Sequence, residues 1–232
     1  MQKTLLLLTL FLSAIALNAQ DVMLLYDFGR AGHHSYEDGP HTTTTVENFS
    51  ADKWGSSYYF VDMYYKSNGV NGAYWEISRE LKFWDAPISA HIEYNGGLNL
   101  GFPFNHAYLA GATYSLNSDD FKRGISFTAM YKYIYKQEEP HNFQLTAVWH
   151  WNFADGLCDF SGFIDFWKEK QPGIDADFVF LSQPELWLNL NHISGVPKEF
   201  NLSVGTEVEF NYNFAYVKGF HCLPALGVKW TF

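Results

Sequence analysis

Long stretches in which every second residue is apolar constrain the fold of this chain most. Between Phe200 and Asn211, one parity carries apolar side chains and threonine, and the other carries Asn, Ser, Gly, Glu207 and Glu209. Alternate residues of a β-strand point to opposite faces of a sheet, so this stretch has one dry face and one wet face. The same alternation recurs at 88–95, 125–133 and 143–151.

The length of these runs favours strands that cross a membrane. They reach 10 to 13 residues, which fits a tilted strand in about 30 Å of hydrocarbon, whereas a strand of a soluble sheet has about 5 or 6. No segment after residue 19 has the roughly 18 unbroken apolar residues of a spanning helix. Because only helices and closed barrels satisfy every backbone group in lipid, we expect an all-β fold, a single transmembrane antiparallel up-and-down β-barrel of about 12 strands. The expected strands lie near 22–30, 41–50, 54–66, 72–84, 87–97, 106–116, 124–136, 142–153, 157–168, 175–190, 199–212 and 220–232.

Composition supports this expectation without deciding it. Aromatic residues make up 19% of the chain and charged residues 17%, which suits a barrel that faces lipid with aromatics. Secreted carbohydrate-binding β-sandwiches can be equally rich in aromatics. The net charge of −10 argues against nucleic acid as a partner. Only Cys158 and Cys222 are present, so disulfides do not organise the fold.

Both ends of the chain carry export signals. Lys3, the apolar run from Leu5 to Leu17 and Ala19 predict a cleaved signal peptide over residues 1–19, which leaves 20–232 as the barrel. The C-terminus has Gly227 and then aromatics at Trp230 and Phe232, and this resembles the signal that the barrel-assembly machinery reads on outer-membrane proteins. We therefore expect a monomer in the cell outer membrane, with outer-membrane lipid and the assembly machinery as partners.

The connections partly agree with an even strand number, which places both termini in the periplasm. Turns at 51–53, 85–87 and 154–156 are tight and are expected there, whereas 30–40, 97–105 and 137–141 are expected outside. Two connections, 117–123 and 191–198, are longer than periplasmic turns need. Arg79 shares a face with apolar residues, which requires a bulge or a position near the headgroups.

The residues that point inward from the expected strands are mostly acidic. Besides the lining residues given at the end of this paragraph, they include Glu80 and Glu209, and the inward cations besides Lys132 are Lys82 and Lys229. Such a lumen attracts cations, repels phosphates and offers neutral solutes many hydrogen-bond partners. The alternative is that the charges pair across a packed lumen and plug it. The expected channel-lining and solute-binding residues are Glu47, Asp62, Glu76, Glu93, Lys132, Asp165, Glu185 and Glu207.

Signals for catalysis, metals or cofactors are weak. His192-Ile-Ser194-Gly195 resembles part of the motif of the outer-membrane phospholipases but lacks its Asn, so a turn is the simpler interpretation. His33, His34 and His41 fall in one expected loop without a carboxylate or thiol at ligand spacing. We therefore expect no enzyme, no metal and no cofactor.

Several segments resemble a bacterial outer-membrane family of unknown function, the DUF5020 type, which is similar to the Tsx nucleoside-specific channel-forming proteins. They are Leu25–Gly29, Lys53–Asp62, Trp75–Glu80 and Ile92–Gly97. The resemblance implies a twelve-stranded barrel with a narrow lumen lined by aromatic and ionisable residues, of which Asp62 and Glu76 match the general character.

These observations together predict a passive narrow channel for small hydrophilic solutes, neutral or cationic, such as nucleosides. Two alternatives stay open, a plugged structural or adhesion barrel and a membrane-embedded lipid-modifying enzyme. An adhesion barrel would have long outer loops. The expected outer loops run to about ten residues, which counts against adhesion.

Overall fold

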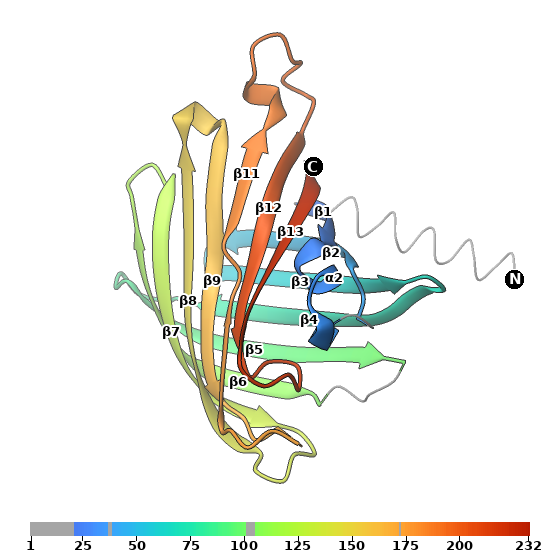
Figure 1. The fold of residues 1–232 in the computed structure, drawn as a ribbon. Coiled ribbons are helices and arrows are strands. Elements are labelled where there is room, and N and C mark those ends of the chain that lie inside the picture. Colours follow the sequence, from blue (N-terminus) through green and yellow to red (C-terminus); the bar gives the residue numbers. More distant parts are fainter. Residues whose placement is uncertain (1–20, 37–38, 101–104, 172) are drawn as a thin grey trace, which may run out of the picture.

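The computed structural model describes residues 21–36, 39–100, 105–171 and 173–232, so the expected signal peptide lies outside the described residues. Nearly all of the regular secondary structure in the described residues is strand (Figure 1). Within the described residues, no helix is long and apolar enough to cross a bilayer. The strands are β1 (Asp21–Asp27), β2 (Thr42–Asp52), β3 (Gly55–Lys66), β4 (Gly69–Leu81), β5 (Ile88–Asn99), β6 (Ala107–Asn117), β7 (Arg123–Ile134), β8 (His141–Phe153), β9 (Cys158–Lys168), β10 (Phe178–Ser182), β11 (Glu185–Asn189), β12 (Leu202–Tyr212) and β13 (Phe220–Thr231). Short helical turns are α2 (Phe28–Ala31), η1 (His34–Tyr36), η2 (Ala154–Gly156) and η3 (Leu190–His192).

The strands close into an antiparallel barrel because β13 pairs with both β12 and β1. β10 and β11 are two halves of one strand, since both pair with β9 and β12 in a continuous register. The ladder is interrupted at Gln183 and Pro184, where proline has no N–H to donate. The barrel is therefore twelve-stranded, and the expected fold is confirmed.

Several strand ends differ from the sequence-based expectation, and two of them have a clear local cause. The first strand ends at Asp27 rather than near residue 30, because the Asp27 carboxylate accepts a hydrogen bond from the Arg30 backbone N–H at 2.8 Å and begins α2. The strand expected from residue 72 begins at Gly69. There a two-residue turn, Ser67 and Asn68, closes the β3–β4 hairpin, and Gly69 follows with a φ of 109°, which suits glycine.

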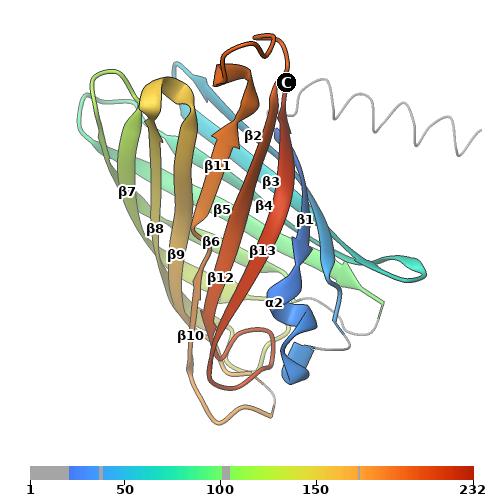
Figure 2. The same cartoon turned by 45° about the horizontal axis from the view of Figure 1, so that its top comes forward.

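The two ends of the barrel differ. At the end that we call the terminus rim, Asp21 pairs with Thr231, and the connections 53–54, 118–122, 154–157 and 190–201 lie there. At the opposite end, the loop rim, α2 and the connections 67–68, 135–140 and 213–219 gather. Figure 2 shows the C-terminus at one end of the barrel and α2 at the other. The two connections that are long for periplasmic turns, 118–122 and 190–201, are both at the terminus rim.

The outer face of the barrel is apolar and exposed, as lipid contact requires. On β7, Phe127 and Tyr131 are each 50% exposed, whereas Met130 and Lys132 of the other parity are buried. The inner wall carries two small apolar clusters between its polar side chains. One consists of Met23, Leu25, Trp187 and Ala225, and the other of Ala107, Leu109, Met130 and Ile134.

Arg79 faces outward but lies near the terminus rim, at the end of β4. Its guanidinium binds both carboxylate oxygens of Asp52 at 2.8 and 2.9 Å and donates to the Ser57 hydroxyl at 2.9 Å. The register of β3 and β4 is regular at this position, since the irregularity lies between Tyr64 and Tyr65. A place near the headgroups, rather than a bulge, thus accommodates this charge.

We expect no disulfide between the two cysteines, Cys158 and Cys222. Cys158 begins β9 at the terminus rim, and Cys222 lies near the start of β13 at the loop rim, and both are free in the structure. Because a disulfide needs Cα atoms within about 7 Å, mass spectrometry of the purified protein should find no peptide linking Cys158 to Cys222. An intramolecular link would contradict the direction of the strands.

Candidate functional site

Every one of the eight expected lining residues lies on the inner face of the barrel. The strand registers place them there. Asp62 pairs with the inward-facing Thr45, Glu76 with Asn95 and Lys132 with Asn142, and the other lining residues share the inward parity of their strands. They fall into two sets. We call Glu47, Asp62, Glu185 and Glu207 the first acidic group, and Glu76, Glu93 and Asp165 with Lys132 the second.

The first acidic group joins opposite walls of the lumen. Glu47 of β2 lies within electrostatic reach of Glu185 of β11, although β12, β13 and β1 separate the two strands around the barrel. Glu207 of β12 is the direct cross-strand partner of Glu185 and interacts electrostatically with Asp62 of β3. Glu47 and Glu185, and likewise Asp62 and Glu207, therefore face one another across the lumen.

The second acidic group does the same further around the barrel. Glu76 of β4 interacts electrostatically with Glu93 of β5 and with Asp165 of β9. Lys132 of β7 is within reach of Glu76 and Asp165, but its ammonium donates to the Gln144 carbonyl at 2.7 Å and lies 4.6 Å from the Trp167 ring centre. Lys132 is thus held against the wall, and three carboxyl groups of the second acidic group stand against this one cation.

Neutral groups hold most of these carboxylates. Tyr58 donates to Glu47 at 2.6 Å, Tyr74 to Glu76 at 2.5 Å, and Trp187 to Glu185 at 2.6 Å. Further donors are Thr45 to Asp62 at 2.6 Å, Thr146 to Asp165 at 2.5 Å and Gln183 to Glu207 at 3.4 Å. A neutral donor steadies a carboxylate without cancelling its charge.

Few cations are available to neutralise this wall. Glu80 and Glu93 share His91, at 2.6 and 3.1 Å. Lys229 is buried with its ammonium 4.8 Å from the centre of the Trp187 ring. Among the described residues, neither Lys132 nor Lys229 forms an ion pair with a carboxylate. Within the two acidic groups, an ion pair thus reaches Glu93 through His91, and the other carboxylates accept mainly from neutral donors.

Water can reach the inner wall. The seven carboxylates of the two groups all keep part of their surface accessible although they point inward. Nearer the terminus rim, the inward-facing Val148 is 44% exposed, beside partly exposed Ser126 and Phe163 on the neighbouring strands. A valine inside a barrel is exposed only where the space in front of it is free, so the lumen widens toward the terminus rim.

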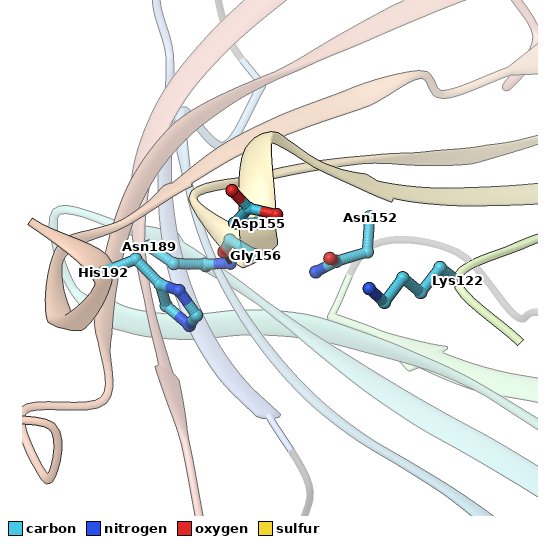
Figure 3. Close-up of a pocket in the computed structure, with 6 residues that line it drawn as sticks. All are labelled: Lys122, Asn152, Asp155, Gly156, Asn189 and His192. Atoms are coloured by element: carbon cyan, nitrogen blue, oxygen red, sulfur yellow. Dashed lines mark hydrogen bonds between the residues drawn. The ribbon is translucent and has the colours of Figure 1, made fainter. Parts of the chain in front are cut away.

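A polar cavity of about 360 Å³ lies at this rim (Figure 3). Its base is ordered by Asp159, whose oxygens accept from Asn152 at 2.5 Å and Asn189 at 2.6 Å. Asn189 also accepts from Ser203 at 2.6 Å. The long connections 118–122 and 190–201 contribute its side walls, so their length has a structural use. The lining residues are Lys122, Asn152, Asp155, Gly156, Asn189 and His192.

At the loop rim, the segment that contains α2 enters the barrel. Arg30 of α2 reaches into the barrel, where it interacts electrostatically with Glu207 and Asp62 of the first acidic group. Burial disfavours its charge, but Glu209 and Asp27 raise the pKa of Arg30 above the usual range, so the guanidinium stays protonated. A fixed positive charge therefore stands at the loop-rim end of an otherwise acidic path.

Of the three histidines in the first loop, His33 takes part in ring contacts. His33 packs edge-on against His221, with 4.8 Å between the ring centres, and against Tyr36. In the part of the chain that the structure describes, no cluster of three or more His, Cys, Asp or Glu side chains could hold a metal ion. His192 lines the cavity at the terminus rim, where the motif that includes Ser194 forms a helical turn and a loop.

Sequence reasoning missed the aromatic donors and the inward course of residues 28–36. The sequence did hold a usable signal for two of the donors. Tyr74 lies two positions from Glu76, and Trp187 lies two positions from Glu185, so each pair shares a face of its strand. For Tyr36 and Asn211 no local signal exists, since their contact joins positions far apart in the chain.

Comparisons with known proteins agree with this geometry. A family model described as "Domain of unknown function (DUF5020)" matches residues 19–232. No curated protein matches the sequence. The structure called "NanC porin structure in rhombohedral crystal form" is similar with a TM-score of 0.59 and 9% identity, over 92% of this chain and 100% of that one. "KdgM porin" is similar with a TM-score of 0.50 and 12% identity, over 92% and 99%. At these identities the likeness shows a shared fold, the porin-like barrel.

Proposed function

The chain belongs to the DUF5020 family, and from this premise and the porin-like barrel we propose that it is a passive channel for small hydrophilic solutes in the outer membrane. The observation that carries the proposal is the pair of acidic groups, which face across a water-accessible lumen and accept hydrogen bonds mainly from neutral donors. In the proposed arrangement, both termini lie on the periplasmic side, so the terminus rim faces the periplasm. Residues 1–19 are removed during export.

The preferred solutes are neutral or cationic. Carboxylates in a lumen with low-dielectric walls stabilise cations and repel anions, and their free lone pairs accept hydrogen bonds from hydroxyl and amino groups. Nucleosides have such donors and no charge. Their assignment as solutes rests on this chemistry and on the sequence resemblance to Tsx channels. The proposed role is transport without catalysis, by a monomer.

A plugged structural barrel is the second candidate, and the contacts of residues 28–36 at the loop rim favour it. Liposomes carrying the purified barrel distinguish the two. We expect adenosine to enter faster than adenosine monophosphate, because the phosphate is repelled and poorly solvated in the lumen. Protein-free liposomes are the control. If adenosine and small ions both enter only at the protein-free rate, the plugged barrel takes the place of the channel.

A further inference from the structure

Residues 28–36 fold back into the barrel and pack against its inner wall. Figure 1 shows α2 on the concave side of β13. Gly29 lies so close to this strand that a Cβ atom would come within 2.6 Å of the Leu223 Cα and 2.5 Å of the Pro224 side chain. Glycine is therefore required for this close approach. The segment is therefore packed closely against the inner wall, and the glycine at position 29 permits this contact.

A largely buried pair of ionic contacts holds the segment in place. The Arg30 guanidinium binds the Asp27 carboxylate at 2.7 Å through Nε and the Glu209 carboxylate at 2.8 Å through Nη2. Glu209 is 5% exposed, and its second oxygen accepts from the Asn211 amide at 2.5 Å. Both oxygens of Glu209 are thus used. The planar fork of arginine reaches two carboxylates at once, which a lysine ammonium on a flexible stem does less well.

A second contact anchors the other end of the segment. Tyr36 is 7% exposed, its hydroxyl shares a hydrogen bond with Asn211, and its ring packs edge-on against His221. Asn211 is fully buried and also contacts the His221 ring nitrogen at 3.3 Å. The wall formed by β12 and β13 therefore offers one polar strip, Glu209, Asn211 and His221, that matches the segment.

We propose that residues 28–36 are a gate at the loop rim, and that Arg30 is both its latch and a selectivity-determining residue of the channel. This inference rests on the proposed channel function. When the latch is closed, Arg30 narrows the path and places a positive charge beside Glu207 and Asp62. When it opens, the path widens and the Asp27 and Glu209 carboxylates are added to the lumen. Opening should therefore increase conductance and cation preference together.

The test compares Arg30→Ala, Arg30→Lys and Glu209→Gln with the wild type, all as the full-length mature barrel. Hydrogen exchange of a peptide covering residues 28–36 reports docking, and single-channel recording in KCl reports the gate. Loss of one partner of a buried ion pair predicts faster exchange in Arg30→Ala by on the order of hundredfold. We expect larger conductance in Arg30→Ala and Glu209→Gln and a smaller effect in Arg30→Lys. Cation preference should rise in Arg30→Ala alone, because Glu209→Gln removes a carboxylate and keeps the Arg30 charge. Lys53→Ala, an exposed cation at the terminus rim, is the control and should behave as wild type.

Heat-modifiable mobility on gels verifies that each variant is folded, and Glu209→Gln, which keeps side-chain size, serves if Arg30→Ala does not fold. If the wild type conducts and these variants leave its conductance and selectivity unchanged, the proposed gate is contradicted and the proposed channel function is not. If neither the wild type nor any folded variant conducts, even with fast exchange in residues 28–36, the proposed channel function itself fails.

Discussion

Replacement of Glu47, Glu185 and Glu207 by Gln should lower the cation-to-anion permeability ratio of the channel by about tenfold. Two unit charges about 12 Å apart interact by about 1.4 kcal/mol at an effective dielectric constant of about 20, and about 1.4 kcal/mol corresponds to a factor of ten. Glutamine keeps the size and hydrogen-bonding capacity of each side chain, so the substitution removes the field alone. Reversal potentials in a KCl gradient measure the ratio.

The salt dependence of this effect provides an internal check. The loss of selectivity should be larger at 0.1 M than at 1 M salt, where the Debye length falls from about 10 to about 3 Å. A matched control removes three acidic charges from exposed connections, with Asp119→Asn, Glu138→Gln and Glu199→Gln. Val204→Ala changes a side chain on the outer face. Both controls should keep wild-type selectivity, and equal losses in the control and the lumen variant would show that the lumen carboxylates do not set it.

Deletion of Phe232, or replacement of Trp230 and Phe232 by Ser, should abolish assembly in the outer membrane. Phe232 is 59% exposed on the outer face, and Trp230 packs edge-on against Phe200. These contacts contribute little to the folded barrel, so the expected defect lies in recognition by the assembly machinery. Outer-membrane yield, read as the heat-modifiable band, should fall close to zero, and aggregates should collect in the periplasm.

Refolding separates recognition from stability. The purified Phe232 deletion should refold in detergent as well as the wild type, although cells fail to assemble it. Phe220→Ser is the matched control, because Phe220 is an equally exposed aromatic at the other end of the same strand, 62% exposed. It should reach the membrane normally. Normal outer-membrane yield of the Trp230 and Phe232 variants would contradict the assembly signal.

The alternation of the sequence predicted the barrel and the face of each strand. On β7 and β8, the expected inward residues Thr128, Lys132 and Gln144 are buried in the lumen wall, and the expected outward residues Tyr131 and Leu145 are exposed. This succeeds because period two directly reflects strand geometry and because lipid and water demand different side chains. The direction of every expected lining residue could thus be read from parity alone.

What could not be predicted depends on contacts across the lumen. Parity placed Glu209 inward, but nothing local shows that Arg30, 179 positions away, forms its partner. The break at Pro184 could have been inferred from the missing N–H, yet its tolerance also depends on Gly162, where a Cβ atom would meet the Gln183 carbonyl oxygen at 2.5 Å. The closure of the barrel determines which distant side chains come into contact, and the alternation of the sequence does not encode these contacts.

The most direct test of the central claim is the reversal potential of the wild-type barrel in a planar bilayer, with KCl more concentrated on one side. The two acidic groups predict defined single-channel steps and a reversal potential displaced toward the equilibrium potential of K⁺, with the displacement shrinking as total salt rises. A displacement toward the equilibrium potential of Cl⁻, or no channel activity from folded protein, would contradict a cation-preferring channel lined by these carboxylates.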